Sequence, residues 1–233
     1  MFCLAGAHIH AQQNLVNVPS GDITPKNKWF FQQQVNFSNI QTFTSKTHFV
    51  WGLGKGWEVG ANLLNMSFNT TARPVLRTSA PPNKPTPFYP VGVITAQKQW
   101  KVNNKWSINV GTQAGTNLSR SIENKRFTHF TYGLARFNPN KDLKFLAGPY
   151  VSDRRMLGDG NLVGYMAGIE WHVHKRWLLL FDHISGNNKN SVSVLGATYN
   201  VTDQFQLIGG WQIPNPNSPE VNAFVVEVNI FNF

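Results

Sequence analysis

The sequence predicts an all-β fold, a closed antiparallel transmembrane β-barrel of about 12 strands with short periplasmic turns and longer extracellular loops. Three observations support this fold class. Tryptophan gathers at one kind of chain connection, the segments between connections alternate weakly with period two, and short connections alternate with long ones. No stretch reaches the roughly 18 uncharged apolar residues of a spanning helix, so strands would cross the membrane.

The aromatic residues come in pairs that bracket short connections. These pairs are Trp51/Trp57, Trp100/Trp106, Phe137/Phe145, Trp171/Trp177 and Tyr199/Phe205. An indole favours a membrane interface because its ring prefers the acyl boundary and its N–H prefers the headgroups. We therefore predict an interfacial aromatic girdle, typical of such barrels, formed by Trp29, Trp51, Trp57, Trp100, Trp106, Trp171 and Trp177.

The segments between the connections have the length and pattern of tilted membrane strands, about 9–12 residues with side chains alternating between lipid and lumen. The expected strands are 28–37, 43–51, 56–67, 91–101, 105–116, 126–137, 143–151, 163–173, 176–184, 191–200, 204–213 and 221–233. Connections at the aromatic end are short, and those at the other end are longer. This asymmetry predicts that the aromatic end is periplasmic.

The N-terminus indicates export to the bacterial outer membrane. Residues 1–11 resemble the remnant of a secretory signal peptide, with small residues at Ala7 and Ala11, and Met1 would be a start assigned too far downstream. Cleavage there would remove Cys3, the single cysteine, which suits an oxidising compartment. Residues 12–27 are expected to be a periplasmic lead-in, and residues 28–233 the barrel.

Composition excludes other classes. The formal net charge of +10 would suggest nucleic acid for a soluble protein, but the basic residues are scattered over turns and loops and no nucleic-acid-binding motif occurs. We therefore expect no nucleic-acid partner. A charged fraction of only 14% with abundant Phe and Trp also argues against disorder.

A resemblance to a known group is visible in two stretches. The opening 15–23 leads through Trp29-Phe30-Phe31 into a strand, and Gly52-Leu53-Gly54-Lys55-Gly56-Trp57 forms a hairpin. Both resemble the small up-and-down outer-membrane barrels of Gram-negative bacteria, especially Bacteroidota. The terminal Phe233 is similar to the signature by which such barrels are handed to the outer-membrane insertion machinery, although a bulge near Asn229 would be needed to put Phe231 and Phe233 on the face of Phe224.

Alternation predicts which side chains face the lumen. Mid-strand charges fall mainly on one face, as expected because a lipid-facing Lys or Arg at the midplane costs about 2–4 kcal/mol. The candidate pore-lining residues are Lys46, His48, Glu58, Gln113, His129, Glu170, His172 and Glu227. Phe130, Tyr132 and Leu134 are expected to face lipid, whereas Lys98 and Asp182 share faces with apolar residues and fit poorly.

The long loops carry more basic than acidic residues. The expected outer-rim basic residues are Arg73, Arg77, Arg120, Arg126, Arg154 and Arg155. Such a rim would contact outer-membrane lipids and lipopolysaccharide phosphates or attract anionic solutes; an ordinary solvated surface is the alternative. The loop 68–90 is rich in proline and predicted not to pair into a ladder.

No catalytic constellation is predicted. Asp182 and His183 are neighbours in a strand, so they point to opposite faces. His172 and His174 share a face but have no third ligand nearby in sequence, so no metal or cofactor is expected. The favoured function is a narrow passive channel for small polar or anionic solutes. The alternatives are a non-conducting barrel that serves as a scaffold or as a subunit of an envelope protein complex and, as a minor option, an outer-membrane lipid hydrolase, for which no His-x-Ser pattern is seen.

Overall fold

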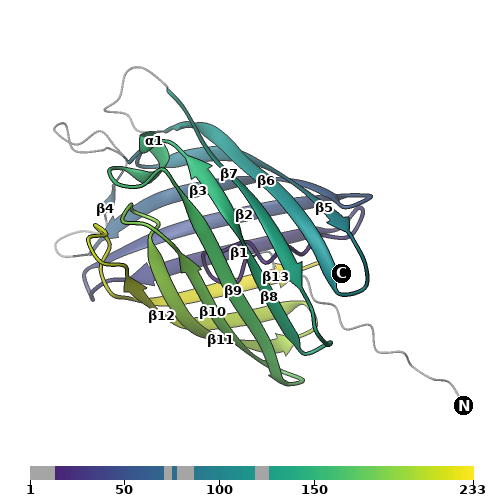
Figure 1. Cartoon of the computed structure of the whole chain (residues 1–233). Coiled ribbons are helices and arrows are strands. Elements are labelled where there is room, and N and C mark those ends of the chain that lie inside the picture. Colours follow the sequence, from purple (N-terminus) through teal and green to yellow (C-terminus); the bar gives the residue numbers. More distant parts are fainter. Residues whose placement is uncertain (1–13, 71–74, 78–86, 119–125) are drawn as a thin grey trace, which may run out of the picture.

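The computed structural model describes residues 14–70, 75–77, 87–118 and 126–233. Thirteen strands alternate with tight turns and loops, and the single helix of these ranges is one turn long (Figure 1). No helix in the described ranges is long and apolar enough to cross a membrane. The elements are β1 Trp29–Phe37, β2 Thr42–Gly54, β3 Trp57–Asn69, β4 Val75–Arg77, β5 Val91–Lys101, β6 Trp106–Asn117, β7 Phe127–Phe137, β8 Leu143–Ser152, α1 Arg154–Leu157, β9 Val163–His174, β10 Trp177–Ile184, β11 Val192–Thr202, β12 Phe205–Pro214 and β13 Ala223–Phe231.

Twelve of these strands form a closed antiparallel barrel. Each pairs with its neighbours in the chain, except that β3 pairs with β5, and β1 closes the ring against β13. The short β4 lies outside the ring and extends β3 through three residue pairs. The twelve predicted strands are confirmed to within a few residues. The expectation that loop 68–90 would not pair is wrong for Val75–Arg77.

The two faces of the wall show that the barrel is inverted relative to a soluble protein. Inside, Gln32, Glu170 and Glu227 are at most 1% exposed, whereas Ile94 on the outside is 72% exposed and Leu195 57%. An outer surface of large apolar side chains, with charged and amide side chains kept on the inner face, is the arrangement that a bilayer stabilises. Membrane insertion thus follows from the distribution of side chains as well as from the closed sheet.

The predicted girdle tryptophans lie at one end of this wall. The short turns that join β2 to β3, β5 to β6 and β9 to β10 all lie at this end. Trp29, at the start of β1, pairs with Trp51 of β2. The six tryptophans that flank these turns are 40–52% exposed, so their rings lie on the outer surface. Lys98 lies on the outer face too, with its Nζ 5.2 Å from the centre of the Trp57 ring. That these tryptophans lie at a lipid interface stays a prediction.

The last strand follows its alternation without interruption. The pairing of β13 with β1 and with β12 runs in continuous register, so this strand lacks the bulge near Asn229 that would have put Phe231 on the face of Phe224. Phe231 therefore points inward, where it packs on Phe30 with ring centres 5.2 Å apart. Phe231 thus belongs to a small buried cluster with Phe30 and Val50, and the terminal Phe233 packs against it.

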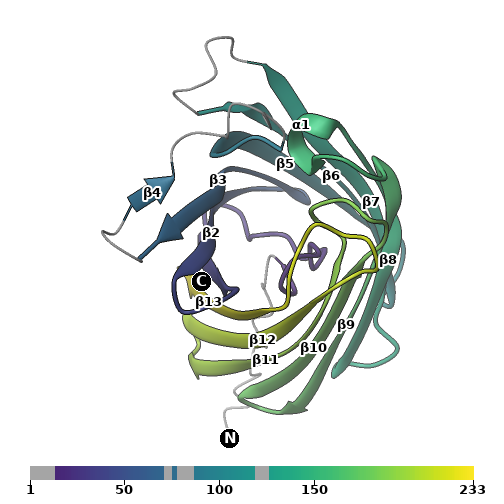
Figure 2. The same ribbon diagram turned by 90° about the vertical axis from the view of Figure 1, so that its left-hand side faces the viewer.

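The chain before β1 occupies the barrel interior. Residues 14–27 are here called the interior segment; residues 14–24 run within the ring of strands, and residues 25–27 are exposed at its short-turn end (Figure 2). Leu15, Val18, Ser20 and Thr24 are fully buried. Residues 14–24 thus pack against the inner wall, which differs from the periplasmic lead-in expected at 12–27, whereas residues 25–27 are exposed at the short-turn end.

Candidate functional site

The tip of the interior segment, residues 15–18, is held by a single carboxylate of the wall. Leu15 N–H donates to Val18 O at 2.8 Å, which makes a tight turn. The turn aims three successive backbone N–H groups, those of residues 16, 17 and 18, at Oδ2 of Asp182 on β10, at 2.9, 2.6 and 3.2 Å. Such a row of N–H groups is a small anion-binding nest. Asp182 thus compensates for the polar backbone that the segment brings into the interior.

Apolar contacts surround this tip. Leu15 and Val18 belong to a buried cluster with Phe130, Leu134 and Met166 of the wall. Val16 belongs to a second cluster on the other side of the tip, with Leu178, Leu180, Val194, Ile208 and Val225 among its members. The middle of the barrel is therefore a packed hydrophobic core that contains the segment.

This core explains one incorrect prediction. Phe130 and Leu134 of β7 are 4% and 1% exposed, so they face inward, and Tyr132 between them donates from its hydroxyl to Gln97 Oε1. His129 consequently lies on the outer face, where its ring stacks on the exposed Phe127. The pore-lining prediction for His129 is wrong because the rule of a polar lumen fails where the wall packs against an apolar segment.

A charged network fixes the base of the interior segment, residues 21–24, to the wall. Asp22 is bonded by Arg136 of β7 through Oδ1 and by Lys144 of β8 through Oδ2, the latter at 2.6 Å. Lys144 also reaches Glu170 Oε2 of β9 at 2.6 Å. Two cations and two carboxylates are thus paired across three strands, with Lys144 and Glu170 almost completely buried.

Three carboxamides of the wall complete this base. Gln99 Nε2 and Asn109 Nδ2 donate to Gly21 O at 2.6 and 2.7 Å, and Gln97 Nε2 donates to Asp22 O at 3.2 Å. Thr24 N–H donates to Glu58 Oε2 at 2.8 Å. Every strand from β5 to β8 therefore contributes a polar side chain to residues 21–22 or to their partners.

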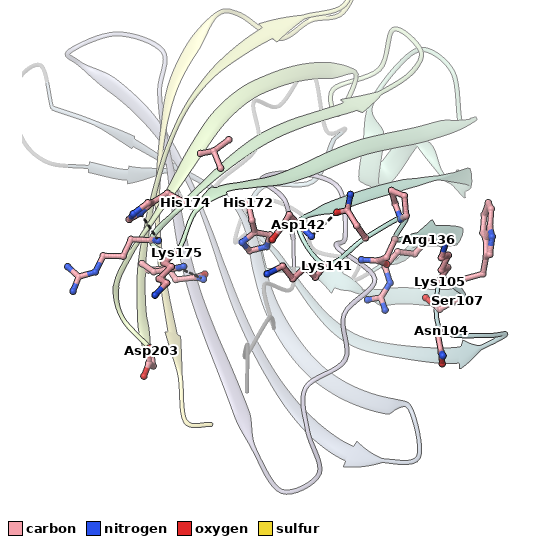
Figure 3. A pocket seen from close by; sticks show the side chains of 18 of the residues that line it. Asn104, Lys105, Ser107, Arg136, Lys141, Asp142, His172, His174, Lys175 and Asp203 are labelled. Atoms are coloured by element: carbon pink, nitrogen blue, oxygen red, sulfur yellow. Dashed lines mark hydrogen bonds between the residues drawn. The ribbon is translucent and has the colours of Figure 1, made fainter. Parts of the chain in front are cut away.

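Below this network the barrel opens into a wide hollow at the short-turn end, here called the vestibule. Its volume is about 1320 Å³, and it is lined by the turns after β5, β7, β9 and β11. Figure 3 shows Lys105, Arg136 and Lys141 among the side chains around this hollow. The lining contains six Lys and Arg residues (Lys101, Lys105, Arg136, Lys141, Lys175 and Arg176) against Asp142 and Asp203, so 6 − 2 gives a formal charge of +4. His172 and His174 lie in the same wall.

Toward the long loops, two small cavities lie among the described residues of the interior. One cavity of about 110 Å³ is lined by Lys46, His48, Glu58 and Gln113, among others, and a second of about 60 Å³ by Lys46 and Glu220. These volumes hold only a few water molecules, each of which occupies about 30 Å³. Lys46 Nζ donates to Asn17 Oδ1 of the tip at 2.9 Å.

The remaining pore-lining candidates fall in different places. Glu170 lies in the charged network, His172 in the vestibule wall, and Glu227 is fully buried on the inner face of β13. Lys144, Arg136 and Asp22 were not predicted as site residues. The poor alternation of Asp182 among leucines was the one available signal that a polar partner would enter the barrel.

The predicted basic rim is only partly described. Arg73 and Arg120 lie outside the described residues, and for Arg77 only the backbone, in β4, is described. Arg126, Arg154 and Arg155 lie at the long-loop end; Arg155 Nη1 donates to Phe127 O at 3.0 Å. Their contact with lipopolysaccharide stays a prediction.

One polar pair lies on the outer surface. His183 Nδ1 of β10 and Ser193 Oγ of β11 are 2.8 Å apart, near the long-loop end of the wall, and the His183 ring is 5.6 Å from that of Tyr165. Both side chains face away from the lumen, since Asp182 and Val194 beside them are buried inside. No group of three or more potential metal ligands occurs within the described ranges.

No family model matches the chain, and no curated protein matches it. Solved structures do match. The KdgM porin has a TM-score of 0.57 and 10% identity, over 87% of this chain and 98% of the porin. The COG4313 outer membrane channel from Pseudomonas putida F1 has a TM-score of 0.54 and 11% identity, over 92% of this chain and 99% of the channel. The chain has the closed 12-stranded antiparallel fold of these outer-membrane β-barrels.

The outer membrane phospholipase of Salmonella typhi, a dimer with bound calcium, also has this fold, with a TM-score of 0.50 and 12% identity, over 90% of this chain and 91% of the phospholipase. One barrel fold thus occurs in porins, channels and an enzyme. At such identities the likeness establishes the fold, and function must be argued from the site.

Proposed function

We propose that this barrel is an outer-membrane channel for small anionic solutes, which enter or leave through the vestibule. The observation that carries the proposal is the excess of Lys and Arg around the 1320 Å³ hollow. Fixed charge of one sign in a concave, low-dielectric wall raises the local concentration of counter-ions. Rings of Lys and Arg are the usual basis of anion selectivity in pores.

The fold neighbours agree with a channel of this kind. Two of them are described as a porin and an outer membrane channel, and the KdgM porin is also known in complex with an oligogalacturonate, which is a polyanion. Their sequence identity is too low to transfer a solute. The substrate class proposed here rests on the charge of this vestibule.

Charge reversal in the vestibule tests the proposal. In planar bilayers with a salt gradient, the reversal potential should show preference for chloride over potassium, and Lys141→Glu with Lys175→Glu should reduce or invert it. Lys26→Glu with Lys55→Glu is the matched control, because it makes the same change of charge at two exposed residues of the same end that do not line the vestibule. Equal selectivity in all three proteins would contradict the anionic assignment.

The filled middle of the barrel supports the non-conducting alternative. A scaffold needs no water path, and the two cavities found among the described residues beside the tip of the interior segment are small, about 110 and 60 Å³. Silent bilayers with folded, heat-modifiable protein, also after the interior segment has been released, would favour a scaffold or a subunit of an envelope complex.

The pair His183 and Ser193 supports an enzyme as a second candidate. A hydroxyl in hydrogen-bond contact with an imidazole is the minimal arrangement of a nucleophile and its base, and this pair faces the lipid side of the wall. Among the residues that the structure describes, Ser193 is the one hydrogen-bond partner of the His183 imidazole and no third group orients the ring, so we place this candidate behind the channel. Release of fatty acid from phospholipid vesicles that is lost in Ser193→Ala would reverse this order.

A further inference from the structure

We propose that Arg136 and Lys144 form a carboxylate-binding site at the floor of the vestibule, which Asp22 occupies in this structure. A carboxylate-bearing solute would compete with Asp22 for this site and so release the interior segment from the lumen. The inference rests on the proposed channel function and names the solute class and the residues that select it.

The geometry is that of a bound carboxylate. Each oxygen of Asp22 has its own cation, Arg136 on Oδ1 and Lys144 on Oδ2. Charge-assisted pairs of this kind are about twice as strong as neutral hydrogen bonds. Because Asp22 belongs to the interior segment and both cations belong to the wall, the interaction is of the same type as that between a ligand and its site.

The charge balance requires an anion at this position. With Asp22 in place, two cations face two carboxylates, Asp22 and Glu170. Without Asp22 the wall would keep two cations against Glu170 alone, with Lys144 almost completely buried. An unpaired charge in such a place is costly. Departure of Asp22 is therefore favoured only if another anion takes its place.

The site is reachable from the vestibule. Arg136 is part of the vestibule lining, and the side chains of Arg136 and Asp22 keep 16% and 12% of their surface exposed. Lys141 and Lys175 lie in the same lining and would draw an anion toward this floor. The site is thus the narrow end of an electropositive hollow.

The neighbouring carboxamides favour an anion that also carries hydrogen-bond acceptors. Gln99, Asn109 and Gln97 donate to the carbonyl oxygens of Gly21 and Asp22. When the segment leaves, these three NH₂ groups need new acceptors, since buried donors without partners are unfavourable. A small carboxylate that also carries several hydroxyl oxygens would satisfy them. Gluconate is a suitable probe, and sorbitol is its uncharged counterpart of similar size.

The first experiment measures release of the segment in a protein with the native site. In a Cys3→Ser background, Val18→Cys places a thiol on a fully buried residue of the tip. Gluconate should increase the rate at which a water-soluble thiol reagent labels this cysteine, in a concentration-dependent way, and sorbitol should not. A labelling rate that is independent of gluconate would overturn the inference.

The second experiment removes the internal competitor. Asp22→Asn should bind gluconate on the order of tenfold more tightly than the parent protein in calorimetry, the equivalent of one weak charge-assisted contact. Asp203→Asn is the matched control because it removes the same charge from the exposed vestibule rim. Adding Arg136→Gln to Asp22→Asn should abolish the gain. Equal affinities of Asp22→Asn and Asp203→Asn would contradict the site.

The two proposals can fail separately. A barrel that conducts chloride selectively but shows no gluconate effect in either experiment retains the channel and loses the carboxylate site. A barrel that binds gluconate at Arg136 but stays silent in bilayers after Asp22→Asn retains the site and loses the channel.

Discussion

Replacement of Asp182 by alanine would release the tip of the interior segment while leaving the barrel wall intact. The carboxylate accepts three backbone N–H groups, from Val16, Asn17 and Val18, at 2.9, 2.6 and 3.2 Å. Each buried N–H left without an acceptor costs about 1–3 kcal/mol. Water would compensate in part, because the 110 Å³ cavity borders Val16 and Asn17.

The lower end of that range is therefore appropriate, and three groups at about 1 kcal/mol each give roughly 3 kcal/mol. Since 1.4 kcal/mol corresponds to a factor of ten, the fraction of molecules with a displaced tip should rise roughly 100-fold. Asp182→Asn keeps an acceptor oxygen and should give a smaller increase.

The assay is the labelling of Val18→Cys in the Cys3→Ser background, because the labelling rate follows the displaced fraction. Asp203→Ala, at an exposed turn, is the control for the loss of an acidic side chain. Heat-modifiable migration should be the same in all variants and would show that the wall is folded. If Asp182→Ala is labelled no faster than Asp203→Ala, then the carboxylate does not hold the tip.

Three further changes test other parts of the structure. Gly52→Ala would place a Cβ 2.0 Å from Pro25 O, which is too close for two non-bonded atoms. The chain at Pro25 should therefore shift, and limited proteolysis after residue 25 should accelerate. Phe231→Ala removes a ring packed on Phe30 and should lower the free energy of unfolding in lipid vesicles by about 3–5 kcal/mol. Trp57→Leu should lower it by about 0.5–1 kcal/mol through loss of the contact with the Lys98 ammonium, and Trp57→Phe should retain part of that contact.

The sequence alone was sufficient for the wall because the wall is built from local rules. A strand between lipid and a polar interior must alternate with period two, and aromatic residues at the turns follow from the chemistry of the membrane interface. Neither signal depends on which residues meet later in the folded chain. For this reason the twelve strands and the inward position of Glu58, Glu170 and Glu227 could be predicted.

Only the tertiary structure decided what fills the barrel. The contacts of Asp22 with Arg136 and Lys144 join residues 114 and 122 positions apart, and those of Asp182 with the tip span more than 160. No local pattern specifies such partners. The interior segment also brought apolar groups into a lumen expected to be polar, which placed Phe130 and Leu134 inside and His129 outside. Alternation divides a strand into two faces, but the packing partner determines which face turns inward.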